Sequence, residues 1–287
     1  MYNYWYNGTI VETDQFSLSI TDPAFLYGAT LFTTLRVYEQ SLQHPRTHWQ
    51  AHCDRLHRSV TAFGWMEPDW QRIRQGAEQL LPLYPVLRIT LFADGRELIT
   101  GRSLPADLAQ RQQQGITAWV CSFGSASGDG ASGNGASGNG ALGLRSLPQH
   151  KTGNYLLPWL ALQQAQQQNT QEAILVDPNG NWLETSTGNL WGYGQGTWWT
   201  PAIAAGILPG IQRQHILTHL RDRQIPHQET TWNPDLIQTL ELLAYSNTVV
   251  ELIPIHTVYN NSGAAIAFTN PPQPLQFLRS YLMACYH

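Results

Sequence analysis

Apolar positions in the first half of the chain follow two different periods. In THWQAHCDRLHRSVTAFG they recur at intervals of four, three, four and three residues, at Trp49, Cys53, Leu56, Val60 and Phe63. This spacing predicts an amphipathic helix that ends near Gly64. Three segments rich in β-branched residues instead indicate strands. They are TLFTTLRVYEQ (30–40), PVLRITLFADG (85–95) and GITAWVCSF (115–123).

The second half repeats this mixture of helix and strand patterns. Helices are predicted over 154–168, 208–224 and 233–241. Pro209 and Gly210 introduce the second of these helices. In the last of these, Asn233 is the expected cap and Pro234 takes the first helical position. Strands are predicted over 172–201, with a turn at Pro-Asn-Gly-Asn, and over LLAYSNTVVELIPI (242–255). Both halves therefore indicate an α/β (α+β) chain.

One segment, GSASGDGASGNGASGNGALG (124–143), has neither pattern. A Gly/Ser/Asn repeat cannot bury a core, so it is predicted to be a linker or loop. It would separate a small N-terminal α/β domain, 1–123, from a larger C-terminal domain, 144–287. The repeat contains a G-x-G-x-x-G at Gly133, Gly135 and Gly138, but no helix pattern follows, so this spacing does not indicate a nucleotide site.

Composition excludes several classes of protein. The net charge of −4 and a pI near 6.2 favour neither nucleic acid nor an anionic membrane as partner. The three scattered cysteines, Cys53, Cys121 and Cys285, do not suggest a disulfide framework. We find no signal-peptide pattern and no apolar stretch approaching 18 residues, which predicts a cytoplasmic chain.

The cations are distributed unusually. Lys151, in SLPQHKTGNYLLPWLALQQAQQQ, is the one lysine of the chain, so the Lys+Arg count of 16 leaves fifteen arginines. Arginine and lysine serve equally as surface charges, but only an ammonium can lose its proton and attack a carbonyl. The survival of one lysine therefore marks Lys151 as a candidate nucleophile.

A lysine that forms a Schiff base needs a carbonyl partner, and pyridoxal phosphate is the commonest one. Its phosphate suits a helix N-terminus such as the one after Leu208-Pro209-Gly210, where Ile211 and Gln212 would present N–H groups. Ser246, Asn247 and Thr248 offer further donors. Its ring nitrogen needs a carboxylate, for which the candidates in this part of the chain are Glu172, Asp177 and Glu184.

In order and spacing, these segments resemble the class IV (fold type IV) pyridoxal phosphate enzymes. The family includes branched-chain aminotransferases, D-amino acid aminotransferases and aminodeoxychorismate lyases. The similar segments follow Lys151 in the family's order and are LETSTGNLW, GILPGIQRQ and YSNTVVELIPI. In the N-terminal half LYGATLFTTLRVY and HCDRLHRS also match, so that the resemblance covers nearly the whole chain. It implies a two-domain fold with the cofactor between the domains.

Carried over by position, the resemblance implies a role for each matched residue. Lys151 would carry the cofactor, and Glu184 would pair with the ring nitrogen. Arg55 would bind the phosphate, although helical periodicity alone places it toward solvent. The remaining cofactor-binding positions are Tyr155, Ile211, Gln212, Asn247 and Thr248. The resemblance also implies a homodimer whose partner subunit contributes to the pocket. We predict, separately, that the Gly/Ser repeat crosses near the mouth of the cleft between the domains.

FTTLRV, residues 32–37, is closest to the FTT-x-RV stretch of aminodeoxychorismate lyases, because branched-chain enzymes more often have an acidic residue at the position of Thr33. The resemblance therefore implies release of pyruvate and 4-aminobenzoate from 4-amino-4-deoxychorismate. The alternative is a class IV aminotransferase. Thr34 is a candidate substrate residue. The two substrate carboxylates call for arginines, with Arg36 and Arg96 as candidates.

Two other classes of function compete with this interpretation. A metal-dependent hydrolase could use His48, His52 and His57, or the helical pair His215 and His219, because residues four apart share a helix face. Neither set has a third ligand or a catalytic glutamate at motif spacing, so no metal site is predicted. A non-catalytic binding protein would leave the lone lysine unexplained.

Overall fold

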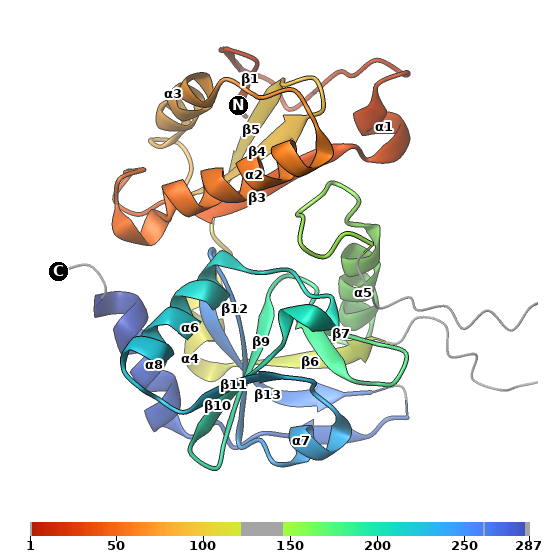
Figure 1. Cartoon of the computed structure of the whole chain (residues 1–287), viewed down its shortest axis with the longest axis vertical. Coiled ribbons are helices and arrows are strands. Elements are labelled where there is room, and N and C mark those ends of the chain that lie inside the picture. The colour runs from red at the N-terminus through yellow and green to blue at the C-terminus, as the bar shows by residue number, and fades with distance from the viewer. Residues whose placement is uncertain (1, 122–145, 261, 285–287) are drawn as a thin grey trace, which may run out of the picture.

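The computed structural model describes residues 2–121, 146–260 and 262–284. The predicted linker at 124–143 and Cys285 lie outside these residues. The described chain forms two units, each with its own sheet, one above the other in Figure 1. Within the described residues, no helix is both long and apolar enough to cross a bilayer.

The N-terminal unit is built on a five-stranded antiparallel sheet in the order β2-β1-β5-β4-β3. Its strands are β1 (Tyr4–Tyr6), β2 (Thr9–Val11), β3 (Thr30–Arg36), β4 (Val86–Phe92) and β5 (Glu97–Arg102). Helices α2 (Trp49–Phe63) and α3 (Trp70–Leu80) cover one face, and the short helix α1 (Pro23–Tyr27) precedes β3 (Figure 1).

Side-chain alternation in β3 gives the two faces of this sheet different roles. Leu31 and Leu35 are fully buried in the core shared with α2 and α3. Since successive side chains of a strand point to opposite faces, Phe32, Thr34 and Arg36 project from the other face, toward the C-terminal unit. One face of β3 thus packs in the N-terminal core, and the other faces the C-terminal unit.

The C-terminal unit contains a nine-stranded mixed sheet. Its main order is β11-β10-β9-β12-β13-β6-β7-β8, with β14 also paired to β13. Parallel pairs join β10 to β11, β13 to β6 and β6 to β7. The strands are β6 (Ile116–Cys121), β7 (Glu172–Val176), β8 (Trp182–Thr185), β9 (Asn189–Gly194), β10 (Thr197–Pro201), β11 (His227–Thr230), β12 (Leu242–Asn247), β13 (Glu251–Tyr259) and β14 (Ala265–Ala267).

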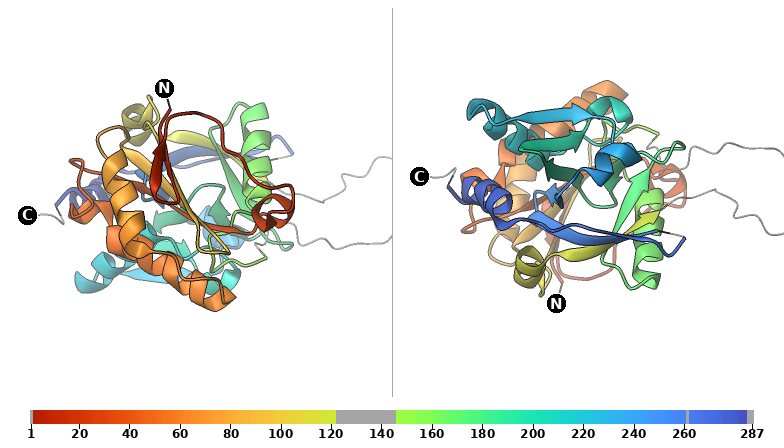
Figure 2. Two further views of the ribbon diagram at one scale, coloured as in Figure 1. Left: turned by 90° about the horizontal axis from the view of Figure 1, so that it is seen from above. Right: turned by 90° about the horizontal axis from the view of Figure 1, so that it is seen from below.

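Helices cover both faces of this larger sheet (Figures 1 and 2). One apolar core joins strand residues such as Trp191 and Leu252 to α6 (Ile211–Asp222) and α8 (Pro272–Ala284). A second core joins the opposite side chains, Leu190 and Ile253 among them, to α4 (Leu108–Gln114) and α7 (Pro234–Gln238). Helix α5 (Leu156–Gln167) packs on β6 and β7 through small residues.

Most of the predicted elements are present. The amphipathic helix is α2, and it ends at Gly64, which adopts the left-handed φ of 62° that favours glycine. The cap of α7 is also confirmed, because Asn233 accepts the backbone N–H of Leu236. The helices at 154–168 and 208–224 correspond to α5 and α6. Several elements were not predicted, among them α3 and α8.

The single strand predicted over 242–255 is wrong. The segment forms a hairpin of β12 and β13, because Asn247 closes a turn: its Oδ1 accepts the N–H groups of Val249 at 2.9 Å and Val250 at 3.0 Å. The chain leaves the turn at Glu251, which has a φ of 62°. An asparagine that bonds its own backbone two residues on is typical of turns.

Strand β6 pairs with β13 and β7, so it belongs to the larger sheet, although it lies before the predicted boundary at 123. Helix α4 packs in the same core through Leu108. We therefore propose that the chain passes from one unit to the other between β5 and α4. The repeat at 124–143 then connects two elements of the C-terminal unit, β6 and α5.

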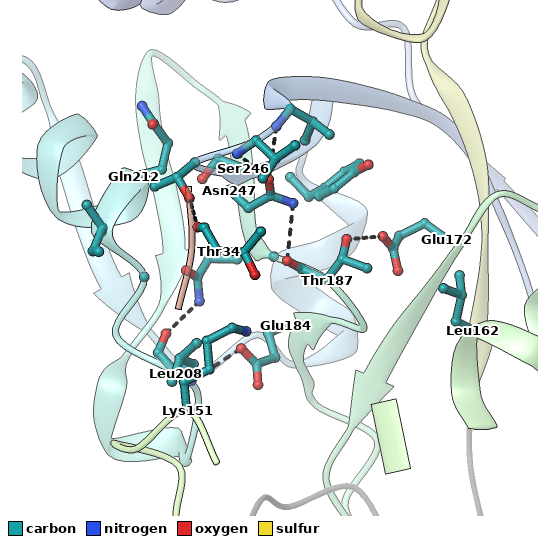
Figure 3. A pocket seen from close by; sticks show the side chains of 18 of the residues that line it. Thr34, Lys151, Leu162, Glu172, Glu184, Thr187, Leu208, Gln212, Ser246 and Asn247 are labelled. Carbon is teal, nitrogen blue, oxygen red and sulfur yellow. Dashed lines mark hydrogen bonds between the residues drawn. The ribbon is translucent and has the colours of Figure 1, made fainter. Parts of the chain in front are cut away.

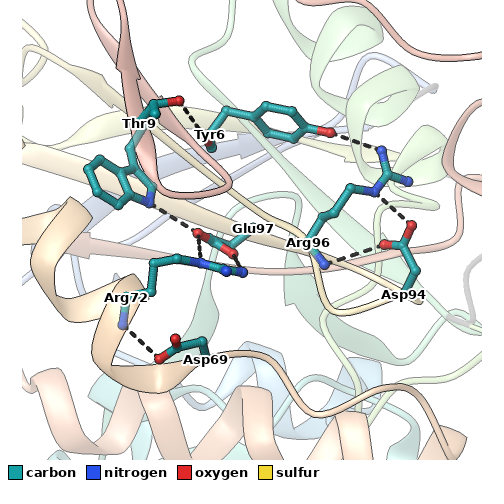
Figure 4. Close-up of polar contacts among 8 residues, drawn as sticks. Tyr6, Thr9, Asp69, Arg72, Asp94, Arg96 and Glu97 are labelled. Atoms are coloured by element: carbon teal, nitrogen blue, oxygen red, sulfur yellow. Dashed lines mark hydrogen bonds and ion pairs between the residues drawn. The ribbon is translucent and has the colours of Figure 1, made fainter.

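An ion pair between a buried glutamate and a half-buried arginine ties α3 to the N-terminal sheet (Figure 4). Glu97 is fully buried at the start of β5, and its carboxylate accepts two hydrogen bonds from Arg72 at 2.7 and 2.6 Å. The indole N–H of Trp5 donates a third at 3.1 Å. Because desolvation of a carboxylate is costly, its partners determine whether this arrangement is tolerated.

Replacing Arg72 with methionine should lower the free energy of unfolding by about 3 kcal/mol, since Glu97 is left buried without its cation. Urea unfolding followed by circular dichroism measures the change. Arg74→Met removes an exposed pair with Glu78 on the same helix and should cost less than about 0.5 kcal/mol. If the two variants lost equal free energy of unfolding, the stabilising role of the Arg72–Glu97 pair would be contradicted.

Candidate functional site

A cavity of about 350 Å³ lies where the two units face each other (Figure 3). It is lined by all eight residues proposed to bind the cofactor, although they come from five separate segments of the chain. They are Arg55, Lys151, Tyr155, Glu184, Ile211, Gln212, Asn247 and Thr248. Thr34, a candidate substrate residue, lines it as well. Tertiary structure thus brings together positions that the sequence separates by up to 214 residues (Thr34 to Thr248).

Lys151 is positioned by the N-terminal sheet, although it follows that unit in the chain. Its carbonyl oxygen accepts the N–H of Phe32 at 2.8 Å, and the N–H of Gly153 donates to the carbonyl of Thr30 at 2.7 Å. A Cβ at Gly153 would lie 2.0 Å from Thr30 Oγ1, so this approach requires glycine. The Lys151 backbone is therefore an extension of the edge of β3.

The Lys151 side chain extends between two aromatic rings. Its Nζ lies 4.7 Å from the ring centre of Phe32 and 4.6 Å from that of Tyr155. It also donates to the Tyr155 hydroxyl at 3.2 Å, and that hydroxyl in turn donates to the Ser186 carbonyl at 3.1 Å. The two rings and the hydrogen bonds from Lys151 to Tyr155 and from Tyr155 to Ser186 thereby fix the position of the amine.

The three candidate carboxylates occupy different places. Glu184 is buried in β8 and accepts the N–H of Leu208 at 3.2 Å, so it points into the cavity beside the turn that precedes α6. Glu172 is buried and also lines the cavity. Asp177 does not line it: its oxygens accept N–H groups from Asn179 and Asn181 and so fold the turn between β7 and β8. Only Glu172 and Glu184 remain candidates for a ring nitrogen.

An anion site is built at the start of α6. Ile211 and Gln212 occupy the first helical positions, whose N–H groups have no partner within a helix. Asn189 holds the preceding turn by donating to the Leu208 carbonyl at 2.8 Å. A Cβ on Gly210 would lie 2.1 Å from Asn189 Oδ1, so glycine is needed for this close packing. These features suit a phosphate group.

The side chains of the β12–β13 turn, which were expected to donate to the phosphate, form hydrogen bonds within the protein instead. The Thr248 hydroxyl donates to the carbonyl of Thr34 at 2.9 Å, and the Asn247 amide donates to the carbonyl of Thr187 at 3.2 Å. The Ser246 hydroxyl accepts the indole N–H of Trp191 at 2.9 Å. In this arrangement the three side chains brace the turn and connect it to β3 and to the loop after β8.

Arg55 is buried, so the solvent-facing position predicted from periodicity is wrong. The buried face of α2 includes the polar residues His52, Arg55 and Ser59, because this part of the helix faces β3 and the cavity. Arg55 Nη2 donates to the Thr33 hydroxyl, whereas Nε has no hydrogen-bond partner. Burial lowers the pKa of this guanidinium to about 10.

No carboxylate within the described part of the chain forms an ion pair with Arg55. A buried cation is costly unless it is paired, so this position favours an anionic ligand. The donors at the start of α6, the buried Arg55, the Glu184 carboxylate and the Lys151 amine match the phosphate, ring nitrogen and aldehyde of pyridoxal phosphate. The site therefore fits that cofactor.

The two arginines predicted to bind substrate lie elsewhere. Arg36 lies 3.8 Å from the Glu251 carboxylate. Arg96 pairs with Asp22 at 2.6 Å and with Asp94 at 2.7 Å, and Figure 4 shows the second of these pairs. Neither lines the cavity, because each arginine already has an acidic partner that holds it.

Arg88 and Arg102, which sequence reasoning missed, do line the cavity. Strand register places them on the same sheet face as Thr34, since Thr34 is opposite Arg88 and Val86 is opposite both Arg36 and Arg102. Alternation in VLRITLF could have identified Arg88 as projecting from the face opposite the core. The position of Arg102 depends on strand pairing.

The histidines of the metal-site alternative are dispersed. His48 stacks on His215 with ring centres 4.0 Å apart, and His52 Nδ1 contacts the Thr33 hydroxyl at 2.5 Å. His57 pairs with Glu67, and His219 stacks on Tyr281. In the ranges that the structure describes, no three His, Cys, Asp or Glu side chains are grouped as metal ligands.

Comparison with known proteins agrees with this geometry. The model of the family "Amino-transferase class IV" matches residues 30–258, which is most of the chain. The chain belongs to this family. It is therefore a pyridoxal phosphate-dependent enzyme of the two-domain fold type IV.

Individual relatives are distant. The branched-chain-amino-acid aminotransferase of Escherichia coli (strain K12) is 23% identical, over 88% of this chain and 84% of that enzyme. The aminodeoxychorismate lyase of Vibrio harveyi is 22% identical, over 76% of this chain and 77% of that one. A solved E. coli branched-chain aminotransferase has a TM-score of 0.74 at 20% identity, covering 99% of this chain and 94% of that one.

A PLP-bound hypothetical aminotransferase from Mycobacterium tuberculosis has a TM-score of 0.76 at 18% identity, with 99% of this chain and 98% of that chain covered. These structural likenesses establish the fold. The substrate is a separate question.

The stacked histidines between the units predict acid sensitivity. Burial, assisted by the neighbouring His215, lowers the pKa of His48 to about 3, and burial also lowers the pKa of His215. Each folded-state pKa lies below the unfolded value near 6.5, so the unfolded chain binds more protons as the pH falls. The free energy of unfolding should then fall below pH 6.5, by up to about 1.4 kcal/mol per pH unit for each histidine.

Urea unfolding between pH 7 and pH 4 measures this slope. His215→Phe keeps a stacked ring but removes one titrating group, so its slope should be shallower than that of the unmodified protein. Some slope should remain, because burial also lowers the pKa of His52 and His219. An identical slope in His215→Phe would contradict the prediction.

Proposed function

We propose that this cavity binds pyridoxal phosphate through Lys151 and catalyses pyruvate release from 4-amino-4-deoxychorismate, leaving 4-aminobenzoate for the folate pathway. When bound, the cofactor supplies an aldehyde for amines and a ring that withdraws electrons from the carbon beside the substrate nitrogen. Lys151 would hold it, Glu184 would accept a hydrogen bond from its ring nitrogen, and Arg55 with the N–H groups of Ile211 and Gln212 would hold its phosphate.

The chain's own contribution to the reaction is proton transfer. Lys151 Nζ would take the proton from the substrate carbon that bears the amino group. The C–O bond of the enolpyruvyl ether would then break, so that the pyruvate fragment leaves and the ring becomes aromatic. A lysine amine is a poor base at neutral pH unless its surroundings favour the neutral form. The buried Arg55 cation in the same cavity would act in that direction.

Recognition of a dicarboxylate is supported by the cavity wall. Arg88 and Arg102 project from the sheet face that carries Thr34, and all three line the cavity that contains Lys151. Arginine binds carboxylates with paired, directional hydrogen bonds. This arginine-bearing wall of the cavity that contains Lys151 is the observation that carries the proposal, and the FTTLRV segment on the same wall supports the lyase assignment.

A class IV aminotransferase is the second candidate. It is favoured by the matches to branched-chain aminotransferases, whose aligned regions cover more of this chain than that of the lyase. In that reaction the same lysine would move a proton between two carbons, and the arginines would bind the carboxylates of a 2-oxo acid. The two candidates share the cofactor site and differ in their products.

Supplying aminodeoxychorismate to the purified enzyme should yield pyruvate and 4-aminobenzoate in equal amounts, measured by chromatography. Lys151→Arg keeps the charge but removes the titratable amine, so turnover should fall more than about a thousandfold. Borohydride should fix a cofactor adduct on Lys151 in the original enzyme alone. Rapid transamination of branched-chain or D-amino acids with 2-oxoglutarate, without 4-aminobenzoate, would favour the second candidate.

We also propose that the enzyme is a homodimer, with α1 and α5 forming the contact surface. Both helices lie on the same side of the molecule (Figures 1 and 2). Their large apolar side chains are exposed, with Phe25 at 67%, Tyr27 at 75% and Trp159 at 51%. A surface this apolar is typical of a site that another protein covers. Its proximity to the segment that carries Lys151 would bring a second copy close to the cavity.

Analytical ultracentrifugation should therefore find a dimer. The double substitution Phe25→Asp and Trp159→Asp should produce a monomer, because the contact would bury two charges without partners. Met283→Asp introduces a charge at a methionine of α8 that is 64% exposed, on another side of the molecule, and should leave the dimer intact. A monomeric original enzyme would refute the proposal.

A further inference from the structure

A second buried glutamate in the cavity has no role in the proposed reaction. Glu172 begins β7 and is only 2% exposed. Its Oε1 accepts the hydroxyl of Ser186 and, at 3.0 Å, the N–H of Ala173. Its Oε2 accepts the hydroxyl of Thr187 at 2.5 Å, the contact drawn in Figure 3. One carboxylate therefore binds two consecutive side chains of the loop between β8 and β9.

That loop connects to the Lys151 amine. The carbonyl of Ser186 accepts the hydroxyl hydrogen of Tyr155 at 3.1 Å, and the Tyr155 oxygen accepts a hydrogen from Lys151 Nζ at 3.2 Å. A phenol has one hydrogen. While that hydrogen is donated to Ser186, the Tyr155 oxygen can only accept from the amine.

The same loop connects to the other side of the cavity. The carbonyl of Thr187 accepts the Asn247 amide, and Asn247 closes the β12–β13 turn. A Cβ at Gly188 would lie 2.4 Å from the Ser246 carbonyl, so the loop and β12 are in tight contact. The orientation of the loop therefore affects both the lysine and the turn.

We propose that Glu172 is a positioning residue for the reaction: by binding Ser186 and Thr187 it fixes the loop, so that Tyr155 presents its oxygen and not its hydrogen to the Lys151 amine. This inference rests on the proposed role of Lys151. Its chemical consequence is specific. An acceptor oxygen beside the amine favours the ammonium form, and loss of that orientation would favour the neutral amine.

The electrostatics of the loop agree with this role. Burial raises the pKa of Glu172, while the hydrogen bonds from Ser186 and Thr187 oppose the rise. Tyr245 also faces this region, and burial together with the nearby Glu172 carboxylate raises the pKa of its phenol. Arg111 and Asp107, which pair at 2.7 Å, are the nearby charges that act on Tyr245 from α4 and its cap. Glu172 is therefore a carboxylate whose hydrogen bonds make its burial tolerable.

The single lysine permits a direct test. In full-length enzyme from which the cofactor has been removed, an acylating reagent modifies amines only at Lys151 and at the N-terminus, and mass spectrometry separates the two. The pH dependence of the Lys151 rate gives the midpoint of its titration, with the N-terminal amine as internal reference. Glu172→Gln should lower that midpoint by about 0.5 to 1 unit, a threefold to tenfold gain in neutral amine near pH 7. Its affinity for pyridoxal phosphate should also weaken.

Three further variants separate positioning from other effects. Ser186→Ala combined with Thr187→Val keeps the Glu172 carboxylate but removes its donors, and should shift the midpoint in the same direction. In a Tyr155→Phe background, Glu172→Gln should cause no additional shift. Glu97→Gln alters the other buried glutamate with an extensive hydrogen-bond set, in the N-terminal sheet, and should cost stability without moving the Lys151 midpoint.

The outcomes are distinct. If neither Glu172→Gln nor the Ser186→Ala and Thr187→Val variant moves the midpoint, the inference is wrong. An equal shift with and without the Tyr155 hydroxyl would show a direct charge effect and would also overturn it. If Glu172→Gln does not fold, the combined Ser186→Ala and Thr187→Val variant alone tests the inference. Absence of a borohydride-fixed adduct on Lys151 in the original enzyme would instead refute the proposed function, whatever the midpoints show.

Discussion

The arrangement of the site depends on two backbone hydrogen bonds between segments that are far apart in the chain. Phe32 donates to the Lys151 carbonyl, and Gly153 donates to the Thr30 carbonyl. They join the segment before α5 to the edge strand of the other unit, so the amine is held by the N-terminal sheet while Glu184 and the start of α6 belong to the C-terminal sheet. The two units cannot separate without moving the lysine away from the groups it works with. The requirement for glycine at position 153 follows from this contact.

A second constraint is the uncompensated charge of Arg55. The helix that carries it packs through a partly polar face, where the guanidinium donates to the Thr33 hydroxyl and its Nε has no hydrogen-bond partner. Arg55 lines the same cavity as the start of α6, where a phosphate would provide the missing negative charge. We therefore propose that binding of the cofactor relieves the cost of burying this cation. Stability without cofactor and affinity for cofactor are linked through this residue.

The two units contribute different groups to the cavity. The C-terminal unit supplies Glu184 and the start of α6, which match the ring nitrogen and the phosphate of the cofactor, and α2 of the N-terminal unit adds Arg55. The N-terminal sheet supplies Thr34, Arg88 and Arg102 from one face, where substitutions do not disturb the core on the opposite face. Because successive side chains of a strand point to opposite faces, residues on the cavity face can change without altering the core on the other face.

The amino-acid sequence by itself determined the local features. Composition singled out Lys151, apolar spacing located α2 and its glycine end, and the Pro-Gly turn marked the start of α6, because each depends on neighbouring residues alone. The order of motifs identified the family and named Glu184 and Arg55. What only the tertiary structure decided were non-local pairings: β6 in the larger sheet, the burial of Arg55, the acidic partners of Arg36 and Arg96, and Arg88 and Arg102 on the cavity wall. Strand register and helix rotation depend on contacts between segments far apart in the chain, and the periodicity of one segment carries no information about its partner.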